Sequence, residues 1–166
     1  MHVAGERGPF VAPSARAQLT GLSREVGFLD LARAVYEGLA FAARDCYAAM
    51  GHRPEEVRVA GGAARSRAVR RILASVLNAP VRTCAREEAG AAGAAMMAAV
   101  ALGVFPDIAA ACRVWVDPLL GDALAPEAEL AGRYDALFPV YQAIHRQMLP
   151  VWRDLARVRR ELEHGD

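Results

Sequence analysis

The sequence has 166 residues, the size of one ordinary domain, and all 20 of its basic residues are arginine. Without lysine, these residues can build neither a Walker-A phosphate loop nor a Schiff-base site. The net charge of +1 gives no basic field for nucleic acid, so we expect no nucleic-acid partner. Any phosphate that binds here must contact arginine, backbone N–H groups, a helix N-terminus or a metal.

Cysteine use and hydropathy indicate a cytoplasmic protein without a membrane contact. Cys46, Cys84 and Cys112 are widely spaced and form no C-x-x-C motif, which predicts buried free thiols and no zinc site. No signal peptide follows Met1. The most apolar stretch, 89–105, is rich in alanine and glycine, and this favours a buried helix over a membrane span.

The first half of the chain alternates between helices and strands. Glycine and proline turn signals predict an irregular loop over residues 1–27. Apolar spacing and β-branched runs then predict a helix over 28–50, a strand over 57–60, a turn over 61–66, a helix over 67–77 and a strand over 81–84.

The second half of the chain is predicted to be mainly helical. The pattern gives helices over 89–102, 105–112 and 127–161, with a loop over 116–126. Small residues in the first of these predict close packing against its neighbours, Pro139 and Pro150 are expected to kink or divide the last, and Trp115 and Trp152 are expected to be packing anchors. Two strands between helices predict an α/β fold with parallel pairing, and they are too few for a complete sheet.

The junction between the strand at 57–60 and the helix at 67–77 carries the strongest chemical signal. Gly61 and Gly62 allow the backbone to approach a flat ligand or a phosphate, because no Cβ intrudes. The following helix offers N-terminal N–H groups, and Ser66 stands at its N-cap position. The pattern is also compatible with a purely structural turn, in which Ser66 only caps the helix.

Other polar residues have simpler interpretations. Glu87 and Glu88 predict favourable first-turn carboxylates that point in different directions, not a catalytic pair. His145 is expected to be a surface or packed histidine, and the arginines of 157–160 predict a solvated helix end. We assign no catalytic residue and no metal ligand.

Five segments resemble, in order and at family spacing, the C-terminal domain of the FGGY carbohydrate kinases, a branch of the actin-like ATPase superfamily. Residues 5–10 are similar to the family's Gly-Glu-Arg-x-Pro loop, and 33–41 to its Arg-Ala-x-x-Glu-Gly-x-Ala-Phe helix. Residues 60–66 resemble its Gly-Gly-x-x-x-Ser adenosine motif, and 88–95 its Glu-Ala-x-Ala-x-Gly-Ala-Ala helix. Residues 134–141 are similar to the closing helix, with its two tyrosines.

The resemblance implies a fold and an activity. The fold is α/β over residues 1–166, the C-terminal part of an actin-like (ribonuclease H-like) kinase domain, helix-rich and with an incomplete sheet. The activity is ATP-dependent transfer of the γ-phosphate to a sugar or polyol hydroxyl, with Mg²⁺ on the phosphates. The resemblance also implies that Gly61, Gly62 and Ala63 line the adenine and that Ser66 offers its hydroxyl to the nucleotide.

The family's catalytic aspartate, its Thr-Gly-Thr-Gly loop and its N-terminal sugar-binding domain have no counterpart in these residues. The contexts of Asp45, Asp107, Asp117 and Asp122 do not match the base. We therefore expect the adenosine-binding portion of a kinase, inactive alone, with the sugar or polyol bound by the absent domain. The segment 44–47 is most similar to kinases of xylulose- or erythritol-type substrates.

Two functions of other classes stay open. One is a stand-alone, non-catalytic module that binds a nucleotide, ATP or ADP, or a partner protein. The other is a helical interaction protein without a ligand. The strand at 57–60 would have an unpaired edge, which is a template for self-association, so we expect a homodimer.

Overall fold

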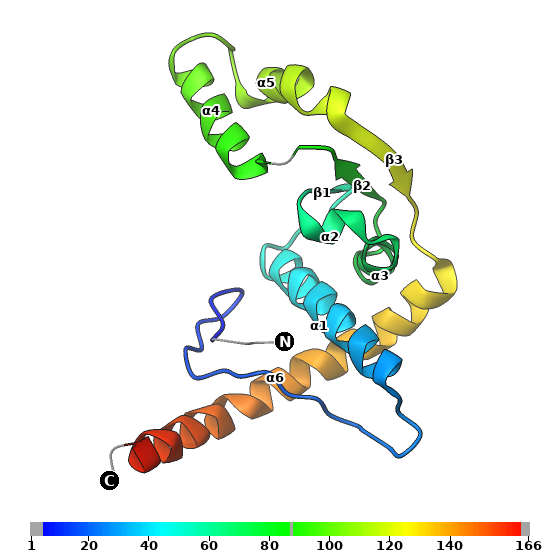
Figure 1. The fold of residues 1–166 in the computed structure, drawn as a ribbon, viewed down its shortest axis with the longest axis vertical. Coiled ribbons are helices and arrows are strands. Elements are labelled where there is room, and N and C mark those ends of the chain that lie inside the picture. Colours follow the sequence, from blue (N-terminus) through cyan, green and yellow to red (C-terminus); the bar gives the residue numbers. More distant parts are fainter. Residues whose placement is uncertain (1–4, 87, 164–166) are drawn as a thin grey trace. The chain divides into compact units, whose positions relative to one another are not determined.

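The chain folds into two compact units in a computed structural model that describes residues 5–86 and 88–163 (Figure 1). The first, called the helical unit below, combines the N-terminal residues up to Arg53 with those from Ala128 onward. The second, the sheet unit, spans Pro54–Glu127. The sheet unit is therefore inserted between the two sequence segments that build the helical unit.

Helix α1 (Phe28–Ala49) is the first element of the helical unit. It begins after Gly27, whose backbone N–H donates to the Asp30 carboxylate at 2.9 Å. It ends just before Gly51, which has a φ of +65°, in the left-handed region that favours glycine. The helix predicted over 28–50 is confirmed.

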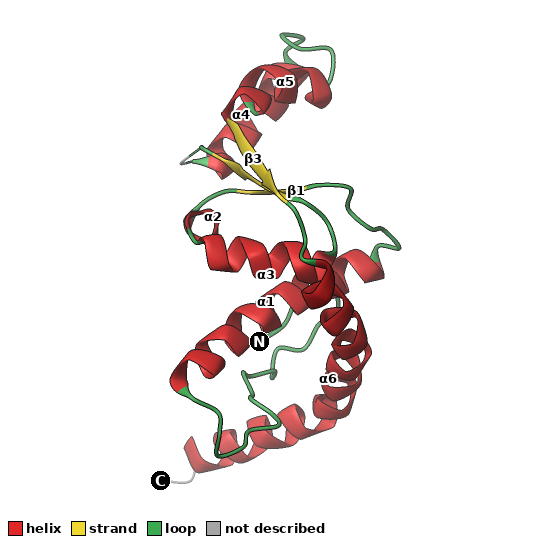
Figure 2. Ribbon diagram, turned by 90° about the vertical axis from the view of Figure 1, so that its right-hand side faces the viewer, coloured by secondary structure: helices red, strands yellow, loops and turns green. Residues whose placement is uncertain are grey.

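Helix α6 (Ala128–Glu163) is one element of 36 residues and confirms the long helix predicted over 127–161. Pro139 and Pro150 lie inside it and do not divide it. A proline removes one backbone hydrogen bond and crowds the preceding turn, and the axis of α6 is visibly bent in Figure 2.

A partly buried network of side chains joins α1 to α6. The Tyr134 hydroxyl and the Arg33 guanidinium both donate to one oxygen of Glu37, each at 2.7 Å. Tyr134 is 2% exposed, and this burial, together with Glu37, raises its pKa above the ordinary value of 10.0. Phe41 packs edge-to-face on Tyr134 and stacks on Tyr141 with 5.2 Å between ring centroids. Polar and aromatic contacts thus hold the same pair of helices together.

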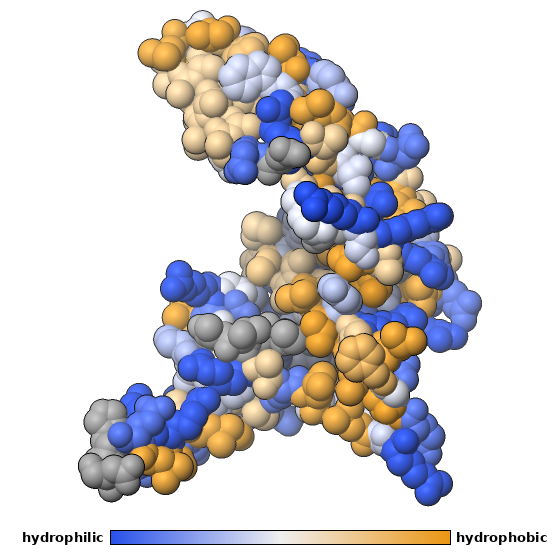
Figure 3. All heavy atoms as spheres, viewed as in Figure 1, coloured by the Kyte–Doolittle hydropathy of each residue, from blue (hydrophilic) through white to orange (hydrophobic). Residues whose placement is uncertain are grey.

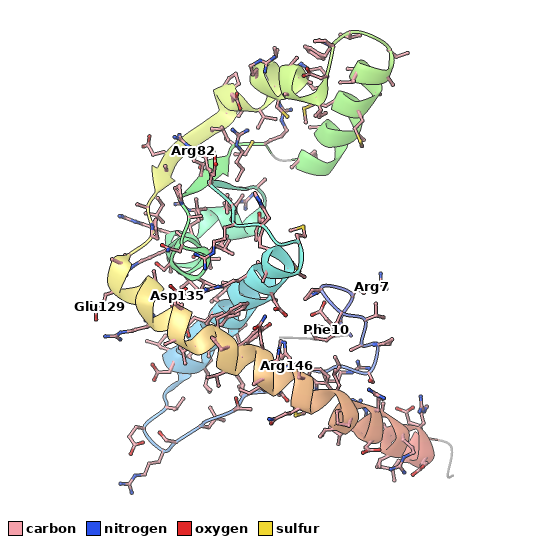
Figure 4. The ribbon with its side chains drawn as sticks, turned by 180° about the vertical axis from the view of Figure 1, so that it is seen from behind. Arg7, Phe10, Arg82, Glu129, Asp135 and Arg146 are labelled. Carbon is pink, nitrogen blue, oxygen red and sulfur yellow. The ribbon has the colours of Figure 1, made fainter. Side chains whose placement is uncertain are left out.

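Further along the pair, Arg44 and Asp45 add two polar links. Arg44 donates to Asp135 on α6 (Figure 4) at 2.6 Å, and its guanidinium lies 4.4 Å from the centroid of the Phe138 ring. Asp45 is buried and accepts from Gln142 at 2.7 Å. Both acidic side chains therefore have structural partners.

The N-terminal loop is irregular, as predicted, but it is anchored to α6. Glu6 and Ala12 form an isolated antiparallel bridge, with two backbone hydrogen bonds of 2.9 Å. Ala12 and Ala15 are buried against Trp152, which is 1% exposed. Trp152 is therefore the packing anchor that the sequence predicts.

The sheet unit contains an open sheet in the order β1-β2-β3. Strands β1 (Val57–Val59) and β2 (Val81–Cys84) pair in parallel, with Val57 opposite Val81, and confirm both predicted strands. Strand β3 (Leu120–Leu124) pairs antiparallel with β2. The loop predicted over 116–126 is therefore wrong in its central part.

Gly121 explains why the sequence suggests a loop where β3 forms. Glycine weakens a strand pattern, yet a Cβ at Gly121 would lie 2.5 Å from the Thr83 hydroxyl oxygen on β2. The close approach of β2 and β3 therefore requires glycine at position 121, and the same glycine makes the sequence of β3 resemble a loop.

Short helices complete the sheet unit. They are α2 (Gly62–Arg65), α3 (Arg67–Leu77), α4 (Ala89–Ala101), α5 (Ile108–Trp115) and the 3₁₀ turn η1 (Asp117–Leu119). Helix α5 begins three residues later than predicted, because the Asp107 side chain caps it by accepting from the Ala110 N–H at 2.7 Å.

Helix α4 departs from expectation. The sequence predicts a buried, closely packed helix, but no residue of α4 is buried in the described part of the chain. No heavy atom would lie within 4 Å of a Cβ at Gly90 or Gly93. Met97 is 64% exposed, and the space-filling view in Figure 3 shows pale orange alanine-rich surface over this helix. Within the described residues α4 contacts α5, and this contact leaves its residues half-buried or exposed. The three cysteines are half-buried rather than buried.

Trp152→Ala should lower the free energy of unfolding by about 3–5 kcal/mol, because it removes the largest fully buried side chain and the anchor of the N-terminal loop. Urea denaturation followed by circular dichroism measures the loss. Leu155→Ala, at a 51% exposed position of the same helix, is the control and should change stability by less than about 0.5 kcal/mol. Equal losses in both variants would contradict the anchoring role.

Tyr134→Phe should cost about 1–2 kcal/mol near neutral pH, because it leaves Glu37 and Arg33 without their shared partner. The raised pKa of Tyr134 makes this contribution complete below about pH 10 and lost as the pH rises through the folded-state pKa. The stability difference between the two proteins should therefore shrink above about pH 10 in parallel denaturation curves. A difference that grows with pH would show the opposite linkage.

Candidate nucleotide site

The turn that leaves β1 is built around a backbone conformation that only glycine adopts readily. Gly61 has φ +76° and ψ −157°, a combination that is essentially restricted to glycine. No heavy atom would lie within 4 Å of a Cβ at Gly61, so the backbone and not crowding imposes glycine here. Gly61 is the N-cap residue from which the chain enters α2.

Gly62 has a different role. It is the first residue of α2, its φ is not positive, and it is exposed with nothing within 4 Å of its missing Cβ. Nothing in the described structure requires a small residue there, and the open side of Gly62 is available to a ligand. Ala63 follows it in α2, and its side chain lies outside what the structure describes.

Ser66 joins α2 to α3 and caps the second helix. Its hydroxyl oxygen accepts from the Val69 N–H at 3.3 Å, which confirms the predicted N-cap. Capping uses only one acceptor position, so the hydroxyl retains its proton to donate to a ligand. Most of the turn predicted over 61–66 is a one-turn helix, in which the Ala64 N–H donates back to the Gly61 carbonyl at 3.1 Å.

Parallel pairing brings a second segment to the same edge of the sheet. β1 and β2 run side by side, so the turn after Val59 and the segment after Cys84 both follow the carboxyl ends of their strands. In open α/β sheets, ligands bind at this edge. Gly61, Gly62 and Ser66 therefore share it with Arg86 and with the N-terminus of α4, where Glu88 is the N-cap residue. Glu87 lies outside the described residues.

A cavity of about 510 Å³ lies between the end of β2, α4 and η1. Its walls include Arg86, Glu88, Trp115 and the alanines of α4. Arg86 donates to the Trp115 carbonyl at 2.5 Å, while its Nε is buried without a hydrogen-bond partner among the described residues. Phe105 packs edge-to-face on Trp115 at 5.8 Å. Local sequence patterns do not indicate this cavity, because Arg86 and Trp115, which form its polar and aromatic walls, lie 29 residues apart in the chain.

Three further acidic groups of the sheet unit, Asp107, Asp117 and Glu56, are held in structural contacts. Asp107 caps α5, and Asp117 pairs with Arg58 at 3.0 Å. Glu56 bridges Arg58 and Arg82, and hydrogen bonding from Arg82 lowers the pKa of its carboxyl group. Among the described residues no group of three or more histidine, cysteine, aspartate or glutamate side chains is arranged to hold a metal ion.

His145, expected at the surface or packed, is packed. It is 8% exposed and lies against Tyr141 with 4.0 Å between ring centroids.

None of the described helices is long and apolar enough to span a bilayer.

Comparison with known proteins relates this architecture to sugar kinases. A family model described as the FGGY family of carbohydrate kinases, C-terminal domain, matches residues 1–102. An erythritol kinase from Brucella abortus (strain 2308) is 56% identical over 153 residues, which cover 92% of this chain and 29% of that protein. A xylulose kinase from Staphylococcus epidermidis is 29% identical over 160 residues, which cover 95% of this chain and 32% of that protein.

Solved structures share the fold as well. The gluconate kinase from Lactobacillus acidophilus superimposes with a TM-score of 0.80 at 27% identity, over 92% of this chain and 31% of that one. The chain spans about a third of the length of the relatives it matches. The helix-rich α/β fold with an incomplete sheet is thus confirmed as that of actin-like sugar kinases, and the chain belongs to the FGGY family of carbohydrate kinases, where it matches the C-terminal domain.

Proposed function

We propose that the whole protein is an ATP-dependent kinase that phosphorylates a hydroxyl of a small sugar or polyol, and that these residues bind the adenosine part of ATP. The 56% identity to an erythritol kinase over 92% of the chain is the observation that carries this proposal. It favours a four-carbon polyol of the erythritol type over xylulose, for which the identity is 29%. We place the protein in the cytoplasm.

The geometry of the β1–α3 junction supports the adenosine site. Gly61 supplies the glycine-only backbone conformation that joins β1 to α2, Gly62 leaves an open surface against which a flat base can lie, and Ser66 keeps a hydroxyl proton for a ribose or phosphate oxygen. Ala63 is the fourth proposed contact, through its backbone. The turn brings backbone groups close to the ligand, so it needs no lysine.

We propose that Mg²⁺ enters with the phosphates of the nucleotide. Among the described residues no group of three or more potential ligand side chains is arranged to hold the ion. The sugar or polyol would contact parts of the kinase outside these residues. We also propose that the chain forms a homodimer, because among the described residues β1 pairs with β2 alone and its other edge can pair with a second copy.

Gly62→Trp should weaken ADP binding by at least about tenfold, because the indole would occupy the open side of α2. Isothermal titration calorimetry with the full chain measures the effect. Gly132→Trp is the matched control: Gly132 is also an exposed helical glycine with nothing within 4 Å of its Cβ, but it lies on α6 of the helical unit. Unchanged binding in Gly62→Trp would overturn the adenosine site.

An assay of erythritol-dependent ADP formation separates the proposal from its alternative. We expect the 166 residues to bind ADP without forming it, since none of their aspartates matches the family's base. Turnover by this chain would contradict the assignment of catalysis to other parts of the kinase. If neither turnover nor ADP binding occurs, a ligand-free interaction module is favoured.

Sedimentation equilibrium tests the dimer. Twice the chain mass is expected at micromolar concentrations, with dissociation in Arg58→Pro, which removes a backbone N–H from β1. A monomer over the whole concentration range would rule the dimer out.

A further inference from the structure

The arginines near the C-terminal end of α6 line one side of a groove. Together with the loop at 13–16 they line a groove of about 890 Å³ in the helical unit. Its charged lining consists of Arg16, Arg153, Arg157, Arg159, Arg160, Asp154 and Glu163. Five guanidinium groups face two carboxylates, so the groove carries an excess of positive charge in a chain whose net charge is only +1.

The two walls of this groove are fixed by burial. Ala15 is 0% exposed and packs with Ala12 against Trp152, which stands one residue before Arg153. The Arg16 guanidinium donates through Nη1 to the carbonyls of Pro13 and Ala15, at 3.2 and 2.7 Å. Its Nε and Nη2 have no acceptor among the described residues. Arg16 is therefore held in place by the loop and keeps donors for an incoming anion.

The opposite wall presents positive charge at helical spacing. Arg153, Arg157 and Arg160 are separated by four and three residues, so they lie on one face of α6. From the first to the last the helix rises about 10 Å. Arg157 pairs with Asp154 at 3.5 Å and with Glu161 at 3.3 Å, across surface-exposed contacts of little strength.

Arg153 and Arg159 combine a place on the groove with free guanidinium groups. Neither has an ion-pair partner or a hydrogen-bond acceptor among the described residues. Elsewhere Arg33, Arg44 and Arg82 all bind carboxylates of the fold. Two guanidinium groups on one groove are thus left without a structural counter-ion.

We propose that this groove binds a small molecule that carries a diphosphate. Guanidinium groups bind phosphate oxygens through paired, charge-assisted hydrogen bonds, and a wall of arginines about 10 Å long accommodates two linked phosphates. The volume of about 890 Å³ lies in the range of small-molecule sites rather than of extended macromolecular surfaces. All residues that line the groove belong to the helical unit, and none of them is among the residues proposed to bind adenosine, so titration with pyrophosphate tests the groove by itself.

Titration of the full chain with inorganic pyrophosphate tests this site, in EDTA and at an ionic strength of about 50 mM. We expect saturable binding that Arg153→Ala/Arg159→Ala weakens at least about tenfold. The control is Arg133→Ala/Arg146→Ala, which removes the same charge from the same helix outside the groove (Arg146 is labelled in Figure 4). This control should weaken binding less than about twofold.

A variant of opposite effect sharpens the test. Asp154→Asn removes a carboxylate that competes for Arg157, so it should tighten pyrophosphate binding a few-fold. If circular dichroism shows that the double alanine variant is misfolded, Arg153→Lys/Arg159→Lys replaces it and should still weaken binding, because lysine cannot form the paired contact.

ADP distinguishes a nucleotide from free pyrophosphate as the occupant. It is titrated into Gly62→Trp, in which the proposed adenosine site is blocked. Tighter binding of ADP than of pyrophosphate identifies a nucleoside diphosphate, and equal binding identifies the diphosphate alone. No saturable binding of pyrophosphate up to about 10 mM, or equal weakening by the groove and control variants, would overturn the site.

Discussion

The backbone at Gly61 is the constraint on which the sheet unit depends. Its φ of +76° and ψ of −157° are accessible in practice only to glycine, and this residue joins the end of β1 to α2 and α3. The helix then returns the chain to β2 alongside β1, in parallel and in register. Parallel pairing in turn places the ends of both strands at one edge. The position of the proposed nucleotide site therefore follows from a single glycine conformation.

The sequence predicts those parts of the fold whose signals are local. Gly51 ends α1, Ser66 caps α3, and apolar spacing marks both helices. Strand β3 escapes prediction because glycine is needed at position 121 only by the contact with Thr83, 38 residues earlier in the chain, and no local pattern reports such a contact. The exposure of α4 is equally unpredictable from the sequence, since the sequence pattern of a helix of small residues is the same whether or not a neighbour covers it. In the site, the glycines and Ser66 are local signals, whereas the joining of Arg86 to Trp115 requires the folded chain.

A composition without lysine makes arginine the only cation for both structure and binding. The guanidinium group has several donors in one plane, so one side chain can contact two elements at once. Arg58 contacts Glu56 and Asp117, and Arg82 contacts Glu56 and the Gly121 carbonyl. These bridges tie the first two strands to η1 and β3. Five arginines that gather along one groove with only two carboxylates are informative against this background, because the fold does not need so much positive charge there.

The discontinuous helical unit has a consequence for the order of folding. The Tyr134–Glu37 hydrogen bond joins residues 97 positions apart, whereas the parallel β1–β2 pair closes within about 25 residues. Contacts of short sequence separation form sooner, because less chain entropy is lost in closing them. During synthesis the sheet unit can therefore assemble before α6 is available to pack against α1. Until α6 leaves the ribosome, the aromatic face of α1 around Phe41 has no cover of its own, and this interval is when the nascent chain is most exposed to misassociation.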